Sequence, residues 1–266
     1  MNRQVVFCGG GNMATGMMSS MLDRGALIAS NVTVSELRQE RCDYLNETYG
    51  VNAVTDASAE IKEADVVIIA VLPQHIKSVT KTLVGNLKAG ALVISIVAGV
   101  TVSMLEEQIG ADNKIVRLMP NTLSKTGNGY SAVVENANIE GADQEVVNEL
   151  VGALGQVMRI TEDLFDVFSA YGCAGPLWMY KLAEAMIDAG VYSGFSRQDS
   201  RNMVIKNMIG AAQNLELTGA HPLQKVDEMC SPGGVTIEGL KTLEDKGFNA
   251  AVLDSVAAAV NKVKAL

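Results

Sequence analysis

The chain has 266 residues, 48% of them hydrophobic and 19% charged, a balance typical of a folded globular protein rather than a disordered one. Its formal net charge is -9 and no run of Lys or Arg exceeds two residues, which argues against nucleic acid and anionic membranes as partners. No apolar stretch is long enough to cross a bilayer and none precedes a signal cleavage site, so we expect a cytoplasmic protein.

Short β-branched runs alternate with helical stretches over the first 160 residues. Strands are predicted at residues 4–8, 32–35, 66–71, 92–97 and 114–118, with a last strand at residues 157–160. Helices are predicted between them at residues 13–24, 37–49, 74–86 and 102–109. Residues 66–71 are apolar without alternation, as in a strand covered on both faces. We therefore expect residues 1–161 to form an α/β domain of the Rossmann type, with a doubly wound, mostly parallel sheet.

The strand pattern stops after about residue 161. Helices are predicted at residues 162–171, 176–192, 197–217, 235–245 and 249–264. In the third of these, apolar residues such as Met203, Met208 and Ile209 recur at helical spacing. The apolar stripes are wider than a small bundle can bury. We therefore expect residues 162–266 to form an all-α domain that pairs with a second copy of the chain.

A glycine-rich segment lies between the first predicted strand and the first predicted helix. It fits the pattern G-x-G-x-x-A at Gly9, Gly11 and Ala14. Gly9 would make the tight turn, Gly11 would let the backbone approach a pyrophosphate, and Ala14 would allow close packing of helix on strand. The first N–H groups of the helix, at Asn12 and Met13, would meet the phosphates. The alternative is an ordinary glycine-rich turn, but the strand before it and the helix after it favour a dinucleotide site.

Two later strand ends are also candidates for coenzyme contact. Ligands of a doubly wound sheet bind beyond the carboxyl ends of its strands. A glycine at position 99 would allow close approach of a nicotinamide or a ribose, and the alternative for both strand ends is ordinary turn chemistry. The residues assigned to the coenzyme here are Ala70, Val71, Leu72, Pro73, Ala98 and Gly99.

Potential metal ligands are sparse. The four cysteines, Cys8, Cys42, Cys173 and Cys230, are far apart and form no CxxC pair, and the chain has two histidines. This spacing predicts free thiols in a reducing compartment and no metal site.

Segments along the whole chain resemble the pyrroline-5-carboxylate reductase family in order and spacing. In the first half they are residues 9–14, 71–74, 95–100 and 116–122. In the second half they are residues 175–176, 184–191, 210–212 and 231–237. The most specific are M-P-N-T at residues 119–122, which adds Asn121 to the coenzyme site, and S-P-G-G-V-T at residues 231–236.

The resemblance implies an oxidoreductase that uses NAD(P)H to reduce the cyclic imine L-1-pyrroline-5-carboxylate to L-proline, the last step of proline biosynthesis. It also implies that the helical domains pair as homodimers, often in rings of dimers. The substrate carboxylate and ring nitrogen would be held by Ser231, Gly233, Gly234, Val235 and Thr236. Independently of the family, these residues lead into a predicted helix, whose free N–H groups can bind a carboxylate. The hydroxyl of Thr236 is the candidate catalytic group, and the alternative for the segment is a helix cap.

The end of the second strand bears on the choice between NADH and NADPH. Glu36 can accept hydrogen bonds from the adenosine ribose hydroxyls of NADH, and its charge disfavours the 2′-phosphate of NADPH. Leu37 stands where NADPH-adapted relatives often have arginine. Ser35 and Arg38 could reach a 2′-phosphate if Glu36 turned outward, and Arg41 lies one helical step further on. NADH is therefore favoured over NADPH, and flavin is disfavoured because nothing suggests an FAD-binding extension.

Four residues depart from the family pattern and leave other substrates open. Leu72 stands where many members have lysine beside the nicotinamide ribose, Leu123 replaces a proline, and Cys173 lies where serines are common. Lys181 puts a charge on a helix position that is commonly apolar. A reductase of a different cyclic imine acid is therefore one alternative.

Lys181 also raises the alternative of a β-hydroxyacid dehydrogenase, in which a lysine on the corresponding helix is the general acid/base. That lysine follows the last glycine of its motif by four residues, whereas Lys181 follows Gly175 by six. We interpret Lys181 as a surface or interface lysine. A coenzyme-binding scaffold without catalysis is a further alternative, which the presence of Ser231 and Thr236 disfavours.

Overall fold

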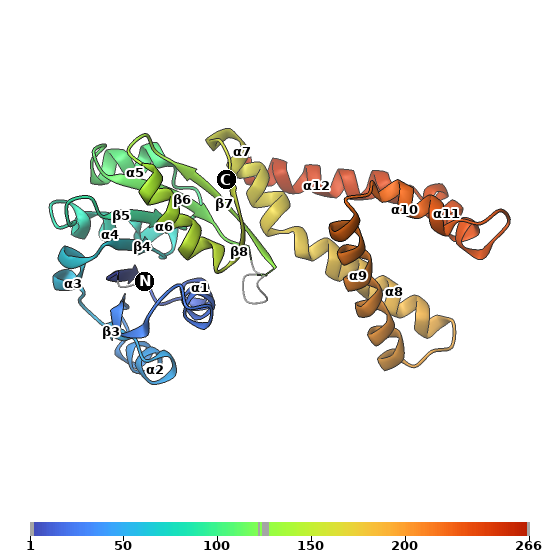
Figure 1. Ribbon diagram of the computed structural model, residues 1–266, viewed down its shortest axis with the longest axis horizontal. Coiled ribbons are helices and arrows are strands. Elements are labelled where there is room, and N and C mark those ends of the chain that lie inside the picture. The colour runs from blue at the N-terminus through green and yellow to red at the C-terminus, as the bar shows by residue number, and fades with distance from the viewer. Residues whose placement is uncertain (1–2, 122, 124–127, 265–266) are drawn as a thin grey trace. The chain divides into compact units, whose positions relative to one another are not determined.

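The structure is a computed structural model that describes residues 3–121, 123 and 128–264 of the chain (Figure 1). It contains two compact units, Met1–Cys173 with Val263–Leu266, and Ala174–Lys262. The first unit has helices on both faces of a sheet, and the second consists of helices (Figure 1). Within the described residues, no helix is both long and apolar enough to span a membrane.

The first unit is organised around one sheet, in which the described residues form eight strands in the order β3-β2-β1-β4-β5-β6-β7-β8. The strands are β1 (Val5–Cys8), β2 (Val32–Ser35), β3 (Asn52–Val54), β4 (Val66–Ile69), β5 (Leu92–Ser95), β6 (Lys114–Met119), β7 (Gly129–Glu135) and β8 (Gly155–Arg159). Neighbouring strands are parallel except β6 and β7, which are antiparallel. The predicted doubly wound, mostly parallel sheet is therefore confirmed. The strand order changes direction at β1, which places a ligand crevice beyond its carboxyl end.

Two hydrophobic clusters cover the two faces of this sheet. Along β1, Val5 and Phe7 belong to one cluster, and Val6 and Cys8 belong to the other. This alternation explains why the central strands are apolar at every position. The helices of the unit are α1 (Asn12–Asp23), α2 (Gln39–Tyr49), α3 (Ser58–Glu63), α4 (Ile76–Leu83), α5 (Val102–Ile109), α6 (Gly141–Gly152) and α7 (Glu162–Phe168).

Several elements, short and long, were missed from the sequence. The strands are β3 and β7, and the helices are α3, α6 and α10 (Pro222–Met229). The three-residue strand β3 depends on a distant side chain, because Asn46 on α2 accepts a hydrogen bond from the Ala53 N–H at 2.6 Å and donates one to its carbonyl at 3.2 Å. Such a strand carries too few residues for a periodic pattern. The strands predicted at residues 66–71 and 92–97 end two residues earlier than expected, at Ile69 and Ser95.

Helix α7 and the π-helical turn that follows it, Ser169–Cys173, pack with the first unit. On α7, Phe165 is buried, and the guanidinium carbon of Arg117 lies 3.6 Å from the centroid of its ring. Arg117 also donates to Glu162 Oε1 at 2.6 Å. The contacts therefore divide the chain between Cys173 and Ala174, whereas the sequence pattern divides it at residue 161, where the strands end.

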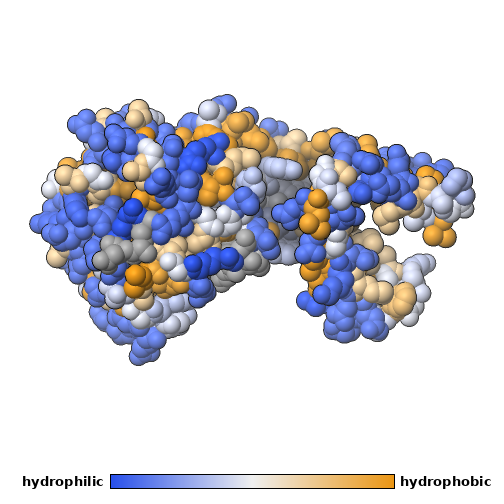
Figure 2. All heavy atoms as spheres, in the orientation of Figure 1, coloured by the Kyte–Doolittle hydropathy of each residue, from blue (hydrophilic) through white to orange (hydrophobic). Residues whose placement is uncertain are grey.

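The second unit contains α8 (Gly175–Tyr192), α9 (Arg197–Thr218), α10, α11 (Val235–Asp245) and most of α12 (Phe248–Lys264). Helices α8 and α9 approach closely at Gly190, where an added Cβ would lie 2.5 Å from Ser200 Oγ. Many apolar side chains of these helices are exposed, and Figure 2 shows some of them at the surface. They include Leu177, Tyr180, Met186, Leu217 and Leu253.

Candidate functional site

A pocket of about 530 Å³ lies beyond the carboxyl ends of β1, β2 and β4. Among the residues predicted to bind the coenzyme, those that line it are Gly9, Gly11, Ser35, Glu36, Ala70, Val71 and Leu72. The wall opposite the glycine segment comes from residues 55–58 after β3 and from α3 and α4, including His75 at the start of α4. Sequence reasoning missed this wall because β3 and α3 were not predicted.

The glycine segment has a backbone that other residues cannot adopt. Gly9 has a φ of +110°, and a Cβ there would lie 2.5 Å from the carbonyl oxygen of Ala70. The Gly9 N–H donates to the carbonyl of Ser35 at 2.8 Å, which ties the turn to the end of β2. A Cβ on Gly11, in contrast, would meet no atom within 4 Å, so this face of the backbone is open.

Helix α1 begins at Asn12 with Gly11 as its N-cap, and no side chain caps it. Its first N–H groups are therefore available to a ligand beside the open face of Gly11. Asn12 and Met13 are exposed at this end, while Ala14 is buried in the core beneath it.

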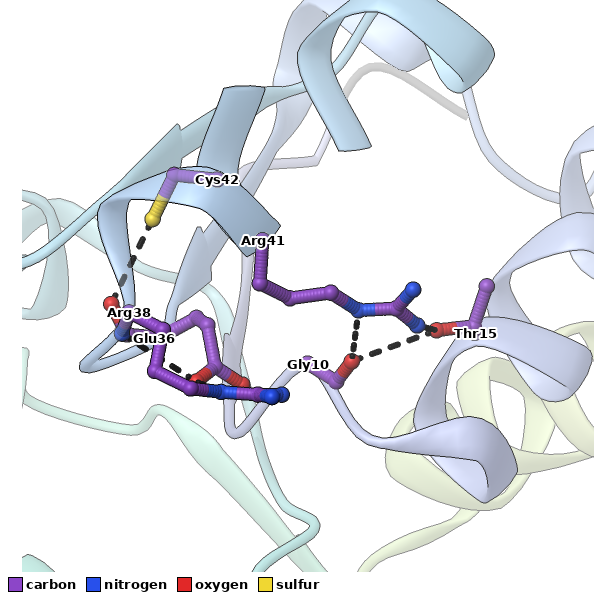
Figure 3. A network of polar contacts seen from close by, with 6 residues as sticks. All are labelled: Gly10, Thr15, Glu36, Arg38, Arg41 and Cys42. Atoms are coloured by element: carbon purple, nitrogen blue, oxygen red, sulfur yellow. Dashed lines mark hydrogen bonds and ion pairs between the residues drawn. The ribbon is translucent and has the colours of Figure 1, made fainter. Parts of the chain in front are cut away.

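Glu36 points inward, toward the glycine segment (Figure 3). Its side chain is 12% exposed, and its Oε2 would be 3.3 Å from a Cβ on Gly10. Its Oε1 accepts hydrogen bonds from the Arg38 backbone N–H at 3.3 Å and from Arg38 Nε at 3.2 Å. Arg38 is 72% exposed, so this ion pair lies at the mouth of the pocket. The outward rotation of Glu36 that would favour a 2′-phosphate is absent from this conformation.

The other residues predicted for the coenzyme do not line the pocket. Pro73, Ala98 and Gly99 are exposed in the segments that follow β4 and β5, and Gly99 has a φ of +73°. Asn121 is buried, and both ends of its amide are occupied. Its Nδ2 donates to the carbonyl of Gly172 at 3.0 Å, and its Oδ1 accepts from the Leu123 N–H at 2.6 Å. This side chain links the segment after β6 to the π-helical turn Ser169–Cys173.

The predicted substrate segment forms an exposed turn before α11. Gly233 has a φ of +67°, and the Gly234 N–H donates to the Ser231 carbonyl at 3.0 Å. A Cβ on Gly234 would collide with Ser231 Oγ, so a larger residue there would force the Ser231 side chain to move. Helix α11 begins at Val235 with Gly234 as its N-cap and has no side-chain cap. The segment therefore caps α11 through Gly234, as the helix-cap alternative expects, and the first N–H groups of α11 receive no side-chain cap.

The hydroxyl of Thr236 has a defined direction. Its Oγ1 lies 2.6 Å from the carbonyl oxygen of Met229. A carbonyl cannot donate, so the hydroxyl hydrogen is directed to Met229 and the lone pairs of Oγ1 remain free to accept. Thr236 is thus prepared to bind a hydrogen-bond donor.

The structure shows the surroundings of three residues that depart from the family pattern. Lys181 has a side chain 75% exposed and pairs with Glu184 at 2.6 Å, and this carboxylate raises the lysine pKa. An exposed, protonated lysine does not suit general acid/base catalysis at neutral pH. Burial raises the pKa of Cys173 to about 12, so its thiol stays neutral. Leu72 is exposed at the pocket. In the described part of the chain, no cluster of His, Cys, Asp and Glu side chains could hold a metal ion.

Comparison with known proteins covers both units. Residues 162–266 match the family described as pyrroline-5-carboxylate reductase dimerisation, and residues 4–99 match the NADP oxidoreductase, coenzyme F420-dependent family. The pyrroline-5-carboxylate reductase of Methanosarcina acetivorans is 30% identical over 265 residues, covering 100% of this chain and 98% of the relative.

Two solved structures are similar over nearly the whole chain. The pyrroline-5-carboxylate reductase of Coxiella burnetii has a TM-score of 0.91 and 28% identity, covering 99% of this chain and 98% of that one. The Plasmodium falciparum pyrroline carboxylate reductase with NADP bound has a TM-score of 0.87 and 30% identity, with the same coverage of 99% and 98%. The chain therefore belongs to the pyrroline-5-carboxylate reductase family.

Proposed function

We propose that this chain reduces L-1-pyrroline-5-carboxylate to L-proline with a nicotinamide coenzyme as the hydride donor. The observation that carries the proposal is that a chain matching 98% of a pyrroline-5-carboxylate reductase has both an open glycine segment at Gly11 and, within Ser231–Thr236, the start of α11 without a side-chain cap. The first feature suits a dinucleotide, and the second suits a small carboxylic acid.

The pocket of the first unit fits the coenzyme. Gly11 has space on its open face, and the N–H groups at the start of α1 have no side-chain cap, so they can receive a pyrophosphate. Ser35 and Glu36 would contact the adenosine ribose. The part of the dinucleotide beyond the adenosine would contact Ala70, Val71 and Leu72, further along the sheet edge. We keep Asn12, Met13, Pro73, Ala98 and Gly99 as coenzyme contacts because they follow strands at the same sheet edge, and assign Asn121 a supporting role.

The substrate segment of the second unit fits an imino acid. The carboxylate would be bound by the N–H groups of Val235 and Thr236 and by the hydroxyl of Ser231, while Gly234, whose N–H donates to the Ser231 carbonyl, would form the turn before them. Gly233 supplies the positive φ that the turn before α11 requires.

Thr236 would select the protonated form of the imine. A protonated imine nitrogen has one N–H and no lone pair, so it can only donate, and Thr236 Oγ1 is oriented by Met229 to accept. Accepting this bond stabilises the cation, which is the form whose carbon attracts hydride. A bound nicotinamide coenzyme would supply a hydride to the C=N carbon, and the electron pair of the π bond would pass to nitrogen. The resulting amine then takes a proton from solvent.

The arrangement of charges favours NADH. Glu36 points into the ribose side of the pocket, and a 2′-phosphate there would meet its carboxylate. Arg38 is paired with Glu36, and Arg41 is bound to the glycine segment, so both cations are engaged in this conformation. We further propose that the protein is a homodimer, because the second unit exposes many apolar side chains and matches a dimerisation family.

A direct assay tests the activity. Oxidation of NADH and NADPH is followed with pyrroline-5-carboxylate, with a six-membered cyclic imine acid and with a β-keto acid. We expect turnover with the five-membered imine and none with the β-keto acid. Turnover confined to the six-membered imine would identify that compound, in place of pyrroline-5-carboxylate, as the substrate. Turnover of the β-keto acid that is lost in Lys181→Met would support the dehydrogenase alternative. Absence of any turnover in protein that binds coenzyme would refute the proposed activity.

A further inference from the structure

The guanidinium of Arg41, on α2, lies against the glycine segment (Figure 3), and Arg41 does not line the pocket. Its Nε donates to the carbonyl oxygen of Gly10 at 3.0 Å, and one terminal nitrogen donates to Thr15 Oγ1 at 2.8 Å. Thr15 Oγ1 in turn donates to the carbonyl of Gly11 at 2.8 Å. Two successive carbonyls, Gly10 and Gly11, are thus held by one cation, directly and through one hydroxyl.

These contacts determine where the N–H groups of the segment point. A trans peptide is planar, and its C=O and N–H point in opposite directions. The described residues contain no cis peptide, so holding the Gly10 carbonyl toward Arg41 directs the Gly11 N–H the other way. The same reasoning directs the Asn12 N–H away from Thr15. Both N–H groups are thus directed away from Arg41 and Thr15, and the backbone at Gly11 has free space, since an added Cβ would meet nothing within 4 Å.

We infer that Arg41 is a positioning residue for coenzyme binding: it orients the Gly11 and Asn12 N–H groups toward the pyrophosphate without contacting the coenzyme itself. This inference rests on the proposed function, because it requires a dinucleotide in the pocket. It gives Arg41 a role that does not depend on a 2′-phosphate, since the pyrophosphate is common to NADH and NADPH. The positive charge behind the segment also complements a negative ligand in front of it.

The test measures coenzyme binding in variants of the whole chain. Arg41→Met keeps much of the stem and deletes both donors, and Thr15→Val removes the hydroxyl that contacts Gly10, Gly11 and Arg41 while leaving the Arg41 Nε donor to the Gly10 carbonyl. We expect the Kd of NADH to rise roughly tenfold to hundredfold in Arg41→Met and about threefold to tenfold in Thr15→Val. Because the pyrophosphate contacts are equal in the ground and transition states, kcat at saturating NADH should stay within about twofold of wild type.

The ratio of the NADPH and NADH Kd values shows whether Arg41 positions the glycine segment or contacts the 2′-phosphate directly. We expect Arg41→Met to weaken both coenzymes, and ADP-ribose, by the same factor. Arg24→Met is the matched control, because Arg24 is exposed just beyond α1, and its Kd values should equal those of wild type. Thermal unfolding shows whether each variant is folded, and Arg41→Lys, which keeps the charge but not the fork of donors, replaces Arg41→Met if that variant unfolds.

Three outcomes would overturn the inference: an unchanged NADH Kd in folded Arg41→Met, a loss confined to NADPH, or a fall in kcat with no change in Kd. A loss confined to NADPH would make Arg41 a ligand of the 2′-phosphate. Failure of the proposed function is distinguishable, because wild-type protein would then not turn over the imine, whereas the inference on Arg41 is tested by the ratio of the variant and wild-type Kd values.

Discussion

Replacing Thr236 with valine deletes one hydroxyl and keeps the branched shape of the side chain. The hydroxyl takes part in two hydrogen bonds in the proposed complex. It donates to the Met229 carbonyl at 2.6 Å, and it would accept from the protonated ring nitrogen of the substrate. The first bond lies in an exposed turn, so water can replace it and we expect the free energy of unfolding to change by less than about 1 kcal/mol.

The second bond determines the kinetic effect. A hydrogen bond to a cation in a closed site contributes about 1–3 kcal/mol, which corresponds to a loss of roughly 5- to 150-fold in kcat/KM for Thr236→Val. Thr236→Ser retains the hydroxyl and should recover most of this loss. Accepting this bond stabilises the protonated imine and raises its pKa in the complex. The alkaline limb of the kcat profile should therefore begin at a lower pH in Thr236→Val than in wild type.

The assay is NADH oxidation against pyrroline-5-carboxylate over a range of pH values, with Thr236→Ser as the control and thermal unfolding as a check of folding. An unchanged kcat/KM for folded Thr236→Val would remove this hydroxyl from the mechanism. A pH profile of Thr236→Val that matches wild type, together with a reduced kcat/KM, would mean that the hydroxyl binds substrate without selecting its protonation state.

Three further predictions concern the coenzyme site and the assembly. Wild type should prefer NADH. Glu36→Ser should raise the ratio of kcat/KM for NADPH to kcat/KM for NADH by roughly tenfold, since it removes a repelling carboxylate and releases Arg38. A wild-type preference for NADPH that the substitution does not alter would contradict this. Gly9→Ala should lower the free energy of unfolding by about 1–3 kcal/mol, because its Cβ would lie 2.5 Å from the Ala70 carbonyl oxygen at a φ of +110°. Gly11→Ala should instead weaken NADH binding with little effect on stability. Equal melting temperatures for the two variants would count against this geometry. Light scattering at micromolar concentration should find a dimer, and a stable, active monomer would refute the assignment of the apolar faces of α8 and α9 to an interface.

Much of the coenzyme and substrate segments follows from local sequence patterns. β1 and α1 lie on either side of the glycine segment, as predicted, and α11 begins at Val235 and ends at Asp245 as expected. These elements depend on hydrophobic period and on glycine, which act within one strand or one helical turn. Residues 119–156 received no predicted element, and there the structure has β7 and α6, whose formation depends on pairing with β6 and packing against the sheet.

The direction and partners of the polar side chains were decided by the tertiary structure alone. Sequence position made Arg41 a possible phosphate ligand, but it binds Gly10, 31 residues away. Arg117 is paired with Glu162, 45 residues away, and this contact attaches α7 to the sheet beyond the point at which the strand pattern ends. Glu36 points inward because it lies between the glycine segment and Arg38. Such contacts join residues that no local pattern relates, so they form only when sheet and helices have packed and brought the ends of separate strands to one edge.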